Sequence, residues 1–149
     1  MILAIDPGNI QSAYCIIDEE TYKPVEFGKV DNKELLELIP YRDYSKAVIE
    51  MVACYGMPVG KEVFDTCVWI GKFLNEINRE EENLIYRKDV KINLCNSMKA
   101  KDSNIRQALI DRFGEVGTKA NKGFFYGFKS DIWSAYAVGI TYLDKLKEV

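Results

Sequence analysis

The spacing of apolar residues predicts a mixed α/β fold, in which helices cover both faces of one five-stranded sheet. Three short strand patterns open the chain, two further strand patterns each follow a helical pattern, and two helical patterns close it. The resulting order, βββαβαβαα, is typical of layers packed around a sheet. The 149 residues suit one domain over residues 1–149, which would bury roughly 70% of the surface of the unfolded chain.

The first strands lie between residues 2 and 30. Residues 2–5 are apolar, and a second apolar run at 12–17 follows after a short tip, as in an antiparallel hairpin. Residues 25–30 alternate between apolar and polar types, which is typical of a half-exposed strand. We expect a short helix at 33–38, capped by Asp31 or Asn32 and followed by Pro40.

The middle of the chain predicts a buried strand, a long helix and another strand. Residues 47–52 are almost all apolar, as in a strand of a parallel sheet that is buried on both faces. A helical pattern runs from about Val59 to Asn78, and residues 84–91 predict the fifth strand. The apolar stripe of the long helix consists of Val63, Cys67, Ile70, Leu74 and Ile77.

Two helices separated by a loop are expected after residue 100. Ser103 is positioned to cap a helix over 104–113 that Gly114 ends. Residues 117–129 are rich in glycine, lysine and phenylalanine, and predict a loop. The last helix is expected to start near Ser130 and Asp131 and to run to about Lys147.

The composition excludes several classes of site. The chain contains no histidine, which excludes Ser-His and Cys-His triads, histidine-based zinc sites and histidine general bases. The four cysteines are scattered, so we expect small buried hydrophobic side chains and neither a zinc site nor a disulfide framework. Hydrolysis by this chain would depend on carboxylates, lysines and a hard metal ion.

Targeting and charge give weaker indications. No apolar stretch reaches the roughly 20 residues of a membrane span, and the first residues do not resemble a signal peptide, so we expect a cytoplasmic protein. The net charge is −3, yet residues 97–130 carry seven basic and three acidic side chains. That segment forms either a local basic face or an ordinary solvated surface.

Three acids occupy positions that favour a metal site. Asp6 ends the first strand before Pro7-Gly8, and Glu50 lies in the otherwise apolar fourth strand. If these strands are parallel neighbours, both carboxylates meet where open α/β sheets bind ligands, and Asp131 at the last helix could face the same point. Taken singly, each acid has an ordinary structural explanation: a turn, an ion-paired strand acid, or a helix N-terminal acid.

The order of elements and the acids resemble the RNase H-like nuclease superfamily, and within it the RuvC-type Holliday junction resolvases. The family's opening strand and DPG turn match ILAIDPG at residues 2–8, and its second acidic strand matches AVIE at 47–50. The segment LCNSMKAKDSNIRQAL at 94–109 is similar to the family's lysine-bearing segment before a helix. The final family motif, DxxDALA, corresponds to DIWSAYA at 131–137, where Ser134 replaces the second acid.

The resemblance implies a Mg²⁺-dependent endonuclease, in which Mn²⁺ can substitute and two ions are bound. Asp6 would bridge both ions, Glu50 and Asp131 would each complete one coordination shell, and Ser134 would be a weak ligand. Lys101 would neutralise the charge that develops on the cleaved phosphate. The products would carry 5′-phosphate and 3′-hydroxyl ends. The short chain looks most like the phage-encoded RuvC-like endonucleases.

The partners implied are branched DNA and a second copy of the chain, with no membrane and no nucleotide cofactor. The candidate phosphate contacts are Lys99, Lys119, Lys122 and Lys129, whose alternative role is solubility. The aromatic side chains of Phe124, Phe125, Tyr126 and Phe128 either wedge between base pairs or pack the loop onto the core. The helix over 59–78, with Phe64, Trp69 and Phe73, would contribute to a homodimer interface or pack within one monomer.

Three rival interpretations remain open at the level of sequence. An ATP-binding protein of the actin and hexokinase group shares the fold core, but needs two such domains and a second Asp-x-Gly segment, which the chain lacks. A catalytically weak or inactive protein that binds branched DNA is compatible with Ser134. An RNA-processing nuclease of the same fold would use the same acids.

Overall fold

The computed structural model describes residues 1–77 and 82–148, and it places all five strands in one sheet. The strand order is β3-β2-β1-β4-β5, with the first three strands antiparallel and β4 and β5 parallel to β1. The strands are β1 (Ile2–Asp6), β2 (Gln11–Ile17), β3 (Pro24–Asp31), β4 (Lys46–Met51) and β5 (Glu82–Tyr86). The predicted fold class is therefore confirmed.

Both faces of the sheet are buried, and this explains the unbroken apolar character of its central strands. Ile2 and Ala4 of β1 face one hydrophobic cluster, whereas Leu3 and Ile5 face another, because successive strand residues point to opposite faces. All four of these side chains are fully buried. A central strand covered on both faces needs apolar residues at every position rather than at alternate ones.

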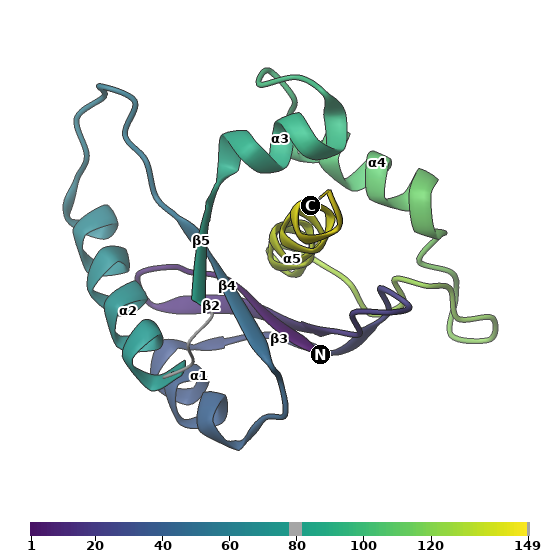
Figure 1. Ribbon diagram of the computed structural model, residues 1–149, viewed down its shortest axis with the longest axis horizontal. Helices are drawn as coiled ribbons and strands as arrows, with labels where there is room; N and C mark the ends of the chain where they lie inside the picture. The colour runs from purple at the N-terminus through teal and green to yellow at the C-terminus, as the bar shows by residue number, and fades with distance from the viewer. Residues whose placement is uncertain (78–81, 149) are drawn as a thin grey trace.

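Helices cover both faces of the sheet, as expected (Figure 1). On one face lie α1 (Asn32–Leu38), the short 3₁₀ turn that follows it at Ile39–Tyr41, and α2 (Lys61–Ile77). On the other face α5 (Ile132–Lys147) packs against the sheet, and α3 (Arg87–Cys95) and α4 (Asp102–Phe113) arch over it. No helix among the described residues is long and apolar enough to span a membrane.

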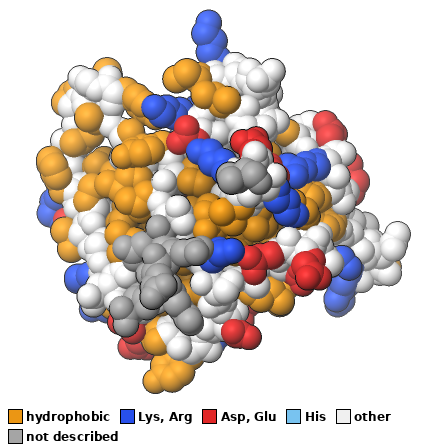
Figure 2. Space-filling view, in the orientation of Figure 1, with side chains coloured by type: hydrophobic (Ala, Val, Ile, Leu, Met, Phe, Trp, Pro, Cys, Tyr) orange, Lys and Arg blue, Asp and Glu red, His pale blue; other side chains and the backbone are white. Residues whose placement is uncertain are grey.

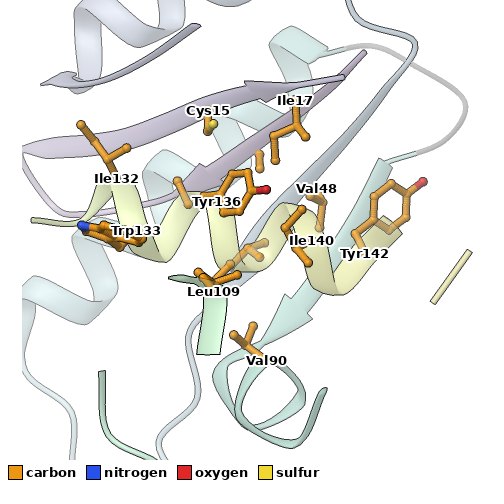
Figure 3. Packing of buried hydrophobic residues seen from close by; sticks show 14 of the residues in the cluster. Cys15, Ile17, Val48, Val90, Leu109, Ile132, Trp133, Tyr136, Ile140 and Tyr142 are labelled. Carbon is orange, nitrogen blue, oxygen red and sulfur yellow. The ribbon is translucent and has the colours of Figure 1, made fainter. Parts of the chain in front are cut away.

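The central helix α5 is the core of the second layer. Figure 3 shows Tyr136 and Ile140 of α5 between sheet residues such as Cys15 on one side and Leu109 of α4 on the other. Gly139 permits this close packing, since a Cβ there would lie 3.0 Å from the Cβ of Ala4. The sheet and the α3–α4 layer therefore hold α5, and the residues at its first turn, in a fixed position.

The expected strand over 84–91 is wrong in its second half. β5 ends at Tyr86, and the additional helix α3 begins at Arg87. Val90 is fully buried and Leu94 packs against the same cluster one turn later, a helical spacing that the short segment concealed. The backbone N–H of Tyr86 donates to Asp89 at 3.4 Å, which helps the helix begin there.

The starting point of α4 also differs from the prediction. Ser103 is not the cap, because the helix begins one residue earlier, at Asp102. The cap position is Lys101, whose backbone N–H donates to Asn104 Oδ1 at 2.8 Å. Asparagine three residues after the cap satisfies that amide, so Asn104 was the residue that indicated where the helix begins. Gly114 ends the helix as predicted.

The buried face of α2 is rotated from the predicted stripe. Ile70 and Ile77 are buried as expected, but Thr66 and Phe73 complete that face, and Val63, Cys67 and Leu74 are only partly buried. Position 78, the predicted end of the helix, lies outside the described residues.

The cysteines are all free, but they do not share one environment. Cys15 is buried as expected, Cys67 and Cys95 are partly buried, and Cys54 is exposed. The prediction of a small buried hydrophobic side chain is therefore wrong for Cys54.

Candidate metal and nucleic-acid site

Asp6 and Glu50 lie together at the carboxyl ends of two adjacent parallel strands. The register pairs Ile5 with Ile49, so the next residue on each strand is one of the two acids. Burial, a hydrogen bond with Glu50 and the negative charges of Glu50 and Asp131 raise the pKa of Asp6 to about 9, although Arg87 opposes the shift. A carboxylate pair in this environment favours a shared proton or a bound cation.

The donor set at this pair suits a hard divalent cation. Glu50 is only 14% exposed, and its Oε1 is buried without a hydrogen-bond partner among the described residues. A buried carboxylate oxygen with an unused lone pair is costly unless an ion or a proton satisfies it. Mg²⁺ and Mn²⁺ prefer carboxylate oxygens as ligands, so Asp6 and Glu50 fit the ion that the family resemblance implies.

Asp131 lies near this pair, but its carboxylate forms an ion pair with a lysine. Asp131 Oδ2 is 2.7 Å from Nζ of Lys29, which projects from β3, and both side chains are partly exposed. Asp6, Lys29 and Asp131 line one pocket of about 380 Å³. In the described part of the chain, no three acidic, cysteine or histidine side chains are grouped as a metal site. For Asp131 to bind an ion together with Asp6 and Glu50, its carboxylate would have to release Lys29.

Ser134 lies one helical turn after Asp131 and faces the same region. Both residues line a second pocket, of about 380 Å³, together with Trp133, Arg87 and Arg106. A hydroxyl at this position is a weaker ligand for a hard cation than the acid that it replaces. The role of Ser134 as a weak ligand stays a prediction.

A buried polar network fixes the turn that follows Asp6. The backbone N–H of Gly8 donates to Ser12 Oγ at 3.0 Å, and Asn32 Nδ2 donates to the Gly8 carbonyl at 2.8 Å. Ser12 Oγ also donates to Asn32 Oδ1 at 2.5 Å, and both side chains are 1% exposed. Gly8 is required here, because a Cβ would lie 2.2 Å from the backbone oxygen of Gln11.

Replacing Asn32 with alanine is expected to destabilise the protein and to weaken any chemistry at Asp6. The change leaves the Gly8 carbonyl and Ser12 Oγ without their buried partner, which costs about 1–3 kcal/mol. The free energy of unfolding from urea titration measures the loss. Gln11→Ala is the matched control, since its amide bonds to Asp31 at an exposed position; an equal loss in both variants would contradict the role of the network.

Arg87 is a site residue that the sequence did not reveal, because the segment was expected to continue as a strand. Its Nη1 lies 3.6 Å from Glu50 Oε1, and its Nη2 forms a close ion pair with Asp102. The guanidinium therefore lies directly beside the carboxylate pair. Lys101 precedes Asp102, is exposed, and forms no ion pair within the described residues. Its contribution to the site stays a prediction.

The predicted DNA-binding lysines lie on two exposed segments. Lys119 and Lys122 lie at a small hairpin, where Gly117 bridges to Lys122 and Thr118 and Asn121 exchange backbone hydrogen bonds. Lys129 is exposed two residues before Asp131. Lys99 is exposed in the turn between α3 and α4. The role of these lysines as phosphate contacts stays a prediction.

The three phenylalanine residues of the same loop pack onto the core rather than pointing outward. Phe125 is fully buried and Phe128 is 6% exposed, and their rings lie 5.1 Å apart. Phe124 stacks on Phe113 of α4 at 5.2 Å. These contacts favour the packing role, and they leave Phe125 and Phe128 unavailable as wedges between base pairs.

The outer face of α2 carries exposed apolar residues. Phe64 is 61% exposed and Val68 is 58% exposed, whereas Trp69 is partly buried against the core. Phe73, which was a candidate for a dimer interface, is fully buried inside the monomer, so packing is its role. Figure 2 shows hydrophobic side chains at the surface on the side where α2 lies.

Comparison with solved structures identifies the fold. The chain is similar to RuvC from Thermus thermophilus, with a TM-score of 0.75, 13% sequence identity, and coverage of 99% of this chain and 95% of that chain. It is also similar to T. thermophilus RuvC in complex with Holliday junction substrate, with a TM-score of 0.72, 11% identity, and coverage of 99% and 94%. The fold is thus of the RuvC, RNase H-like type. No protein-family model and no curated protein sequence matches the chain.

Proposed function

From the RuvC-type fold and its paired carboxylates, we propose that this chain is a divalent-metal-dependent endonuclease for branched DNA such as Holliday junctions. The observation that supports the proposal most strongly is the position of Asp6 beside Glu50 at the carboxyl ends of β1 and β4. One structure with this fold is a RuvC in complex with Holliday junction substrate. The expected products carry 5′-phosphate and 3′-hydroxyl ends.

Four side chains would hold the metal ions in this proposal. Asp6 and Glu50 form the buried part of the site, Asp131 joins after releasing Lys29, and Ser134 ligates weakly or through water. Mg²⁺ or Mn²⁺ held by these side chains would supply the Lewis acidity that activates a water molecule and stabilises the leaving oxygen. Glu50 orients the attacking water, and Lys101 neutralises charge on the phosphate.

A binding protein with little or no nuclease activity is the second candidate. It is favoured by the Lys29–Asp131 ion pair, with Nζ and Oδ2 2.7 Å apart, and by Ser134 in place of a fourth acid. Both features reduce the negative charge available for a second ion. This candidate binds branched DNA with the same selectivity as a nuclease, but leaves it intact.

A substrate panel separates these candidates. Purified protein is incubated in Mg²⁺ with a four-way junction, a flap, a linear duplex of matched sequence, and an RNA hairpin. We expect preferential cleavage of the branched DNAs. Cleavage of RNA alone would favour an RNA-processing nuclease and contradict the proposal, whereas selective binding of the junction without cleavage in Mg²⁺ or Mn²⁺ would favour the inactive binding protein.

Neutralising the two hairpin lysines is expected to weaken DNA binding through electrostatics. Each phosphate contact contributes about 0.9 to the slope of log affinity against log salt concentration. The double variant Lys119→Met/Lys122→Met should therefore reduce the magnitude of this slope for a four-way junction by about 1.8. Fluorescence anisotropy at several salt concentrations measures the slope. The control is Lys23→Met/Lys33→Met, which removes the same charge elsewhere; an equal decrease in both would refute a specific hairpin contact.

A homodimer is expected to use the exposed apolar face of α2. Phe64→Glu places a charge in the middle of that face and should weaken association by about 30-fold or more, the loss expected of an interface hot spot. Sedimentation equilibrium measures the dissociation constant. Val25→Glu is the matched control, because Val25 is also exposed, at 55%, but lies on β3. A dimer of unchanged stability in Phe64→Glu places the interface elsewhere.

A further inference from the structure

Arg87 lies between the carboxylate pair of Asp6 and Glu50 and a third acid, Asp102. Its contacts with the pair and with the third acid differ. Nη2 forms a close ion pair with Asp102, whereas Nη1 is 3.6 Å from Glu50 Oε1. The second distance is too long for a hydrogen bond. Nη1 and Oε1 are both buried and lack hydrogen-bond partners among the described residues. Each atom therefore keeps an unused bonding site, and the Glu50 contact is the one that can be exchanged.

Arg87 also lines three pockets. It lines one pocket of about 240 Å³ with Glu50, another of about 380 Å³ with Asp131 and Arg106, and a third of about 280 Å³ with Lys88. The side chain of Arg87 is 24% exposed, although Nη1 itself is buried beside Glu50. Other basic side chains, Arg106 in the second pocket and Lys88 in the third, add positive charge that attracts a polyanionic strand.

We propose that Arg87 is a substrate-binding residue that exchanges Glu50 for a backbone phosphate when Glu50 binds a divalent cation. This inference rests on the proposed function. A cation on Glu50 would repel the guanidinium, and a phosphate next to the cleaved bond is the anion that replaces the lost partner. Asp102 keeps its contact with Nη2 and holds the guanidinium in place while Nη1 changes partners.

The chemistry of arginine suits this exchange better than that of lysine. A guanidinium presents several N–H donors in a fixed plane, so one edge can stay with Asp102 while another binds phosphate. A lysine ammonium is a point charge that cannot hold the two partners in the same defined geometry. The exchange also links metal binding to substrate binding, because each favours the same arrangement of Arg87.

The salt dependence of junction binding tests the exchange. The wild-type protein, Arg87→Met and Lys88→Met are titrated with a four-way junction at several salt concentrations, once in Ca²⁺ and once in chelator. Only uncut DNA is counted. In Ca²⁺, we expect Arg87→Met to reduce the magnitude of the slope of log affinity against log salt concentration by about 0.9. In chelator the slope should be unchanged, because Arg87 stays beside Glu50 and does not contact phosphate. Lys88→Met, a matched loss of charge at the next residue, should have the same effect in both buffers.

Each outcome supports or overturns the inference. Equal slopes for wild type and Arg87→Met in Ca²⁺ overturn it, as does an equal loss in both buffers, which would indicate a permanent contact. Should Arg87→Met not fold, Arg87→Lys provides the test through affinity, which should fall several-fold in Ca²⁺ and not in chelator. If the wild type binds no branched DNA in either buffer, the proposed function fails as well. Junction binding without an Arg87 effect contradicts this inference alone.

Discussion

Replacing Asp6 with asparagine is expected to abolish cleavage of a four-way junction and to leave binding of that junction intact. Asparagine has the shape of aspartate but lacks the negative charge that a divalent cation needs. Loss of partners that merely support a metal ligand lowers activity by about 10–100-fold, so loss of the central ligand should exceed about 100-fold. Single-turnover cleavage in Mg²⁺ and anisotropy in Ca²⁺ measure the two properties.

The matched control for Asp6→Asn is Asp31→Asn, an isosteric change of an exposed acid that lines the same pocket. It should retain the wild-type cleavage rate. Asp6→Asn should also keep or raise the melting temperature in chelator. Burial and the neighbouring Glu50 raise the pKa of Asp6 to about 9, so Asp6 opposes folding at any pH above the ordinary pKa of an aspartate, and asparagine removes that cost. Wild-type cleavage by Asp6→Asn would show that the metal site is assigned to the wrong residues.

Phe125→Ala is expected to cause the largest loss of stability among single changes in the loop that carries the basic hairpin. The ring of Phe125 is fully buried, 4.8 Å from that of Trp133 and 5.1 Å from that of Tyr136. Removing such a side chain costs about 3–5 kcal/mol, which lowers the melting temperature by roughly 6–20 °C in a chain of this size. Differential scanning calorimetry measures the change.

The neighbouring Tyr126 provides the control for Phe125. Its ring is partly buried and contacts the ammonium of Lys122, with Nζ 5.1 Å from the ring centre. Tyr126→Ala should therefore cost less than about 1 kcal/mol. If both variants lose the same stability, or neither does, the loop is not held by the Phe125 contacts. Its lysines would then lack the fixed position that a defined phosphate contact requires.

The part of the site predicted from sequence follows from local pattern. The apolar segments ending in Asp6 and Glu50 identify two strands, and parallel pairing of those strands then brings the acids together. The helix that begins after Asp131 was equally visible in its apolar periodicity. Most strands and helices were therefore predictable, because each depended on a pattern within about 20 residues.

The unpredicted part depends on pairings between distant segments. Lys29 and Asp131 are 102 positions apart in the chain, and no periodicity indicates which lysine reaches which acid. Arg87 was missed because the residues after β5 have strand-like character, and only burial of Val90 against α5 shows the helix. Asn32 was expected merely as a possible cap, whereas its side chain holds the turn after Asp6.

The most direct test is single-turnover cleavage of a labelled immobile four-way junction by the wild-type protein, in Mg²⁺ and in chelator. The account predicts paired nicks in opposing strands, formed only in Mg²⁺, with 5′-phosphate and 3′-hydroxyl ends that DNA ligase can reseal. A junction that is bound yet stays intact in both Mg²⁺ and Mn²⁺, or that is cut equally well in chelator, would contradict it.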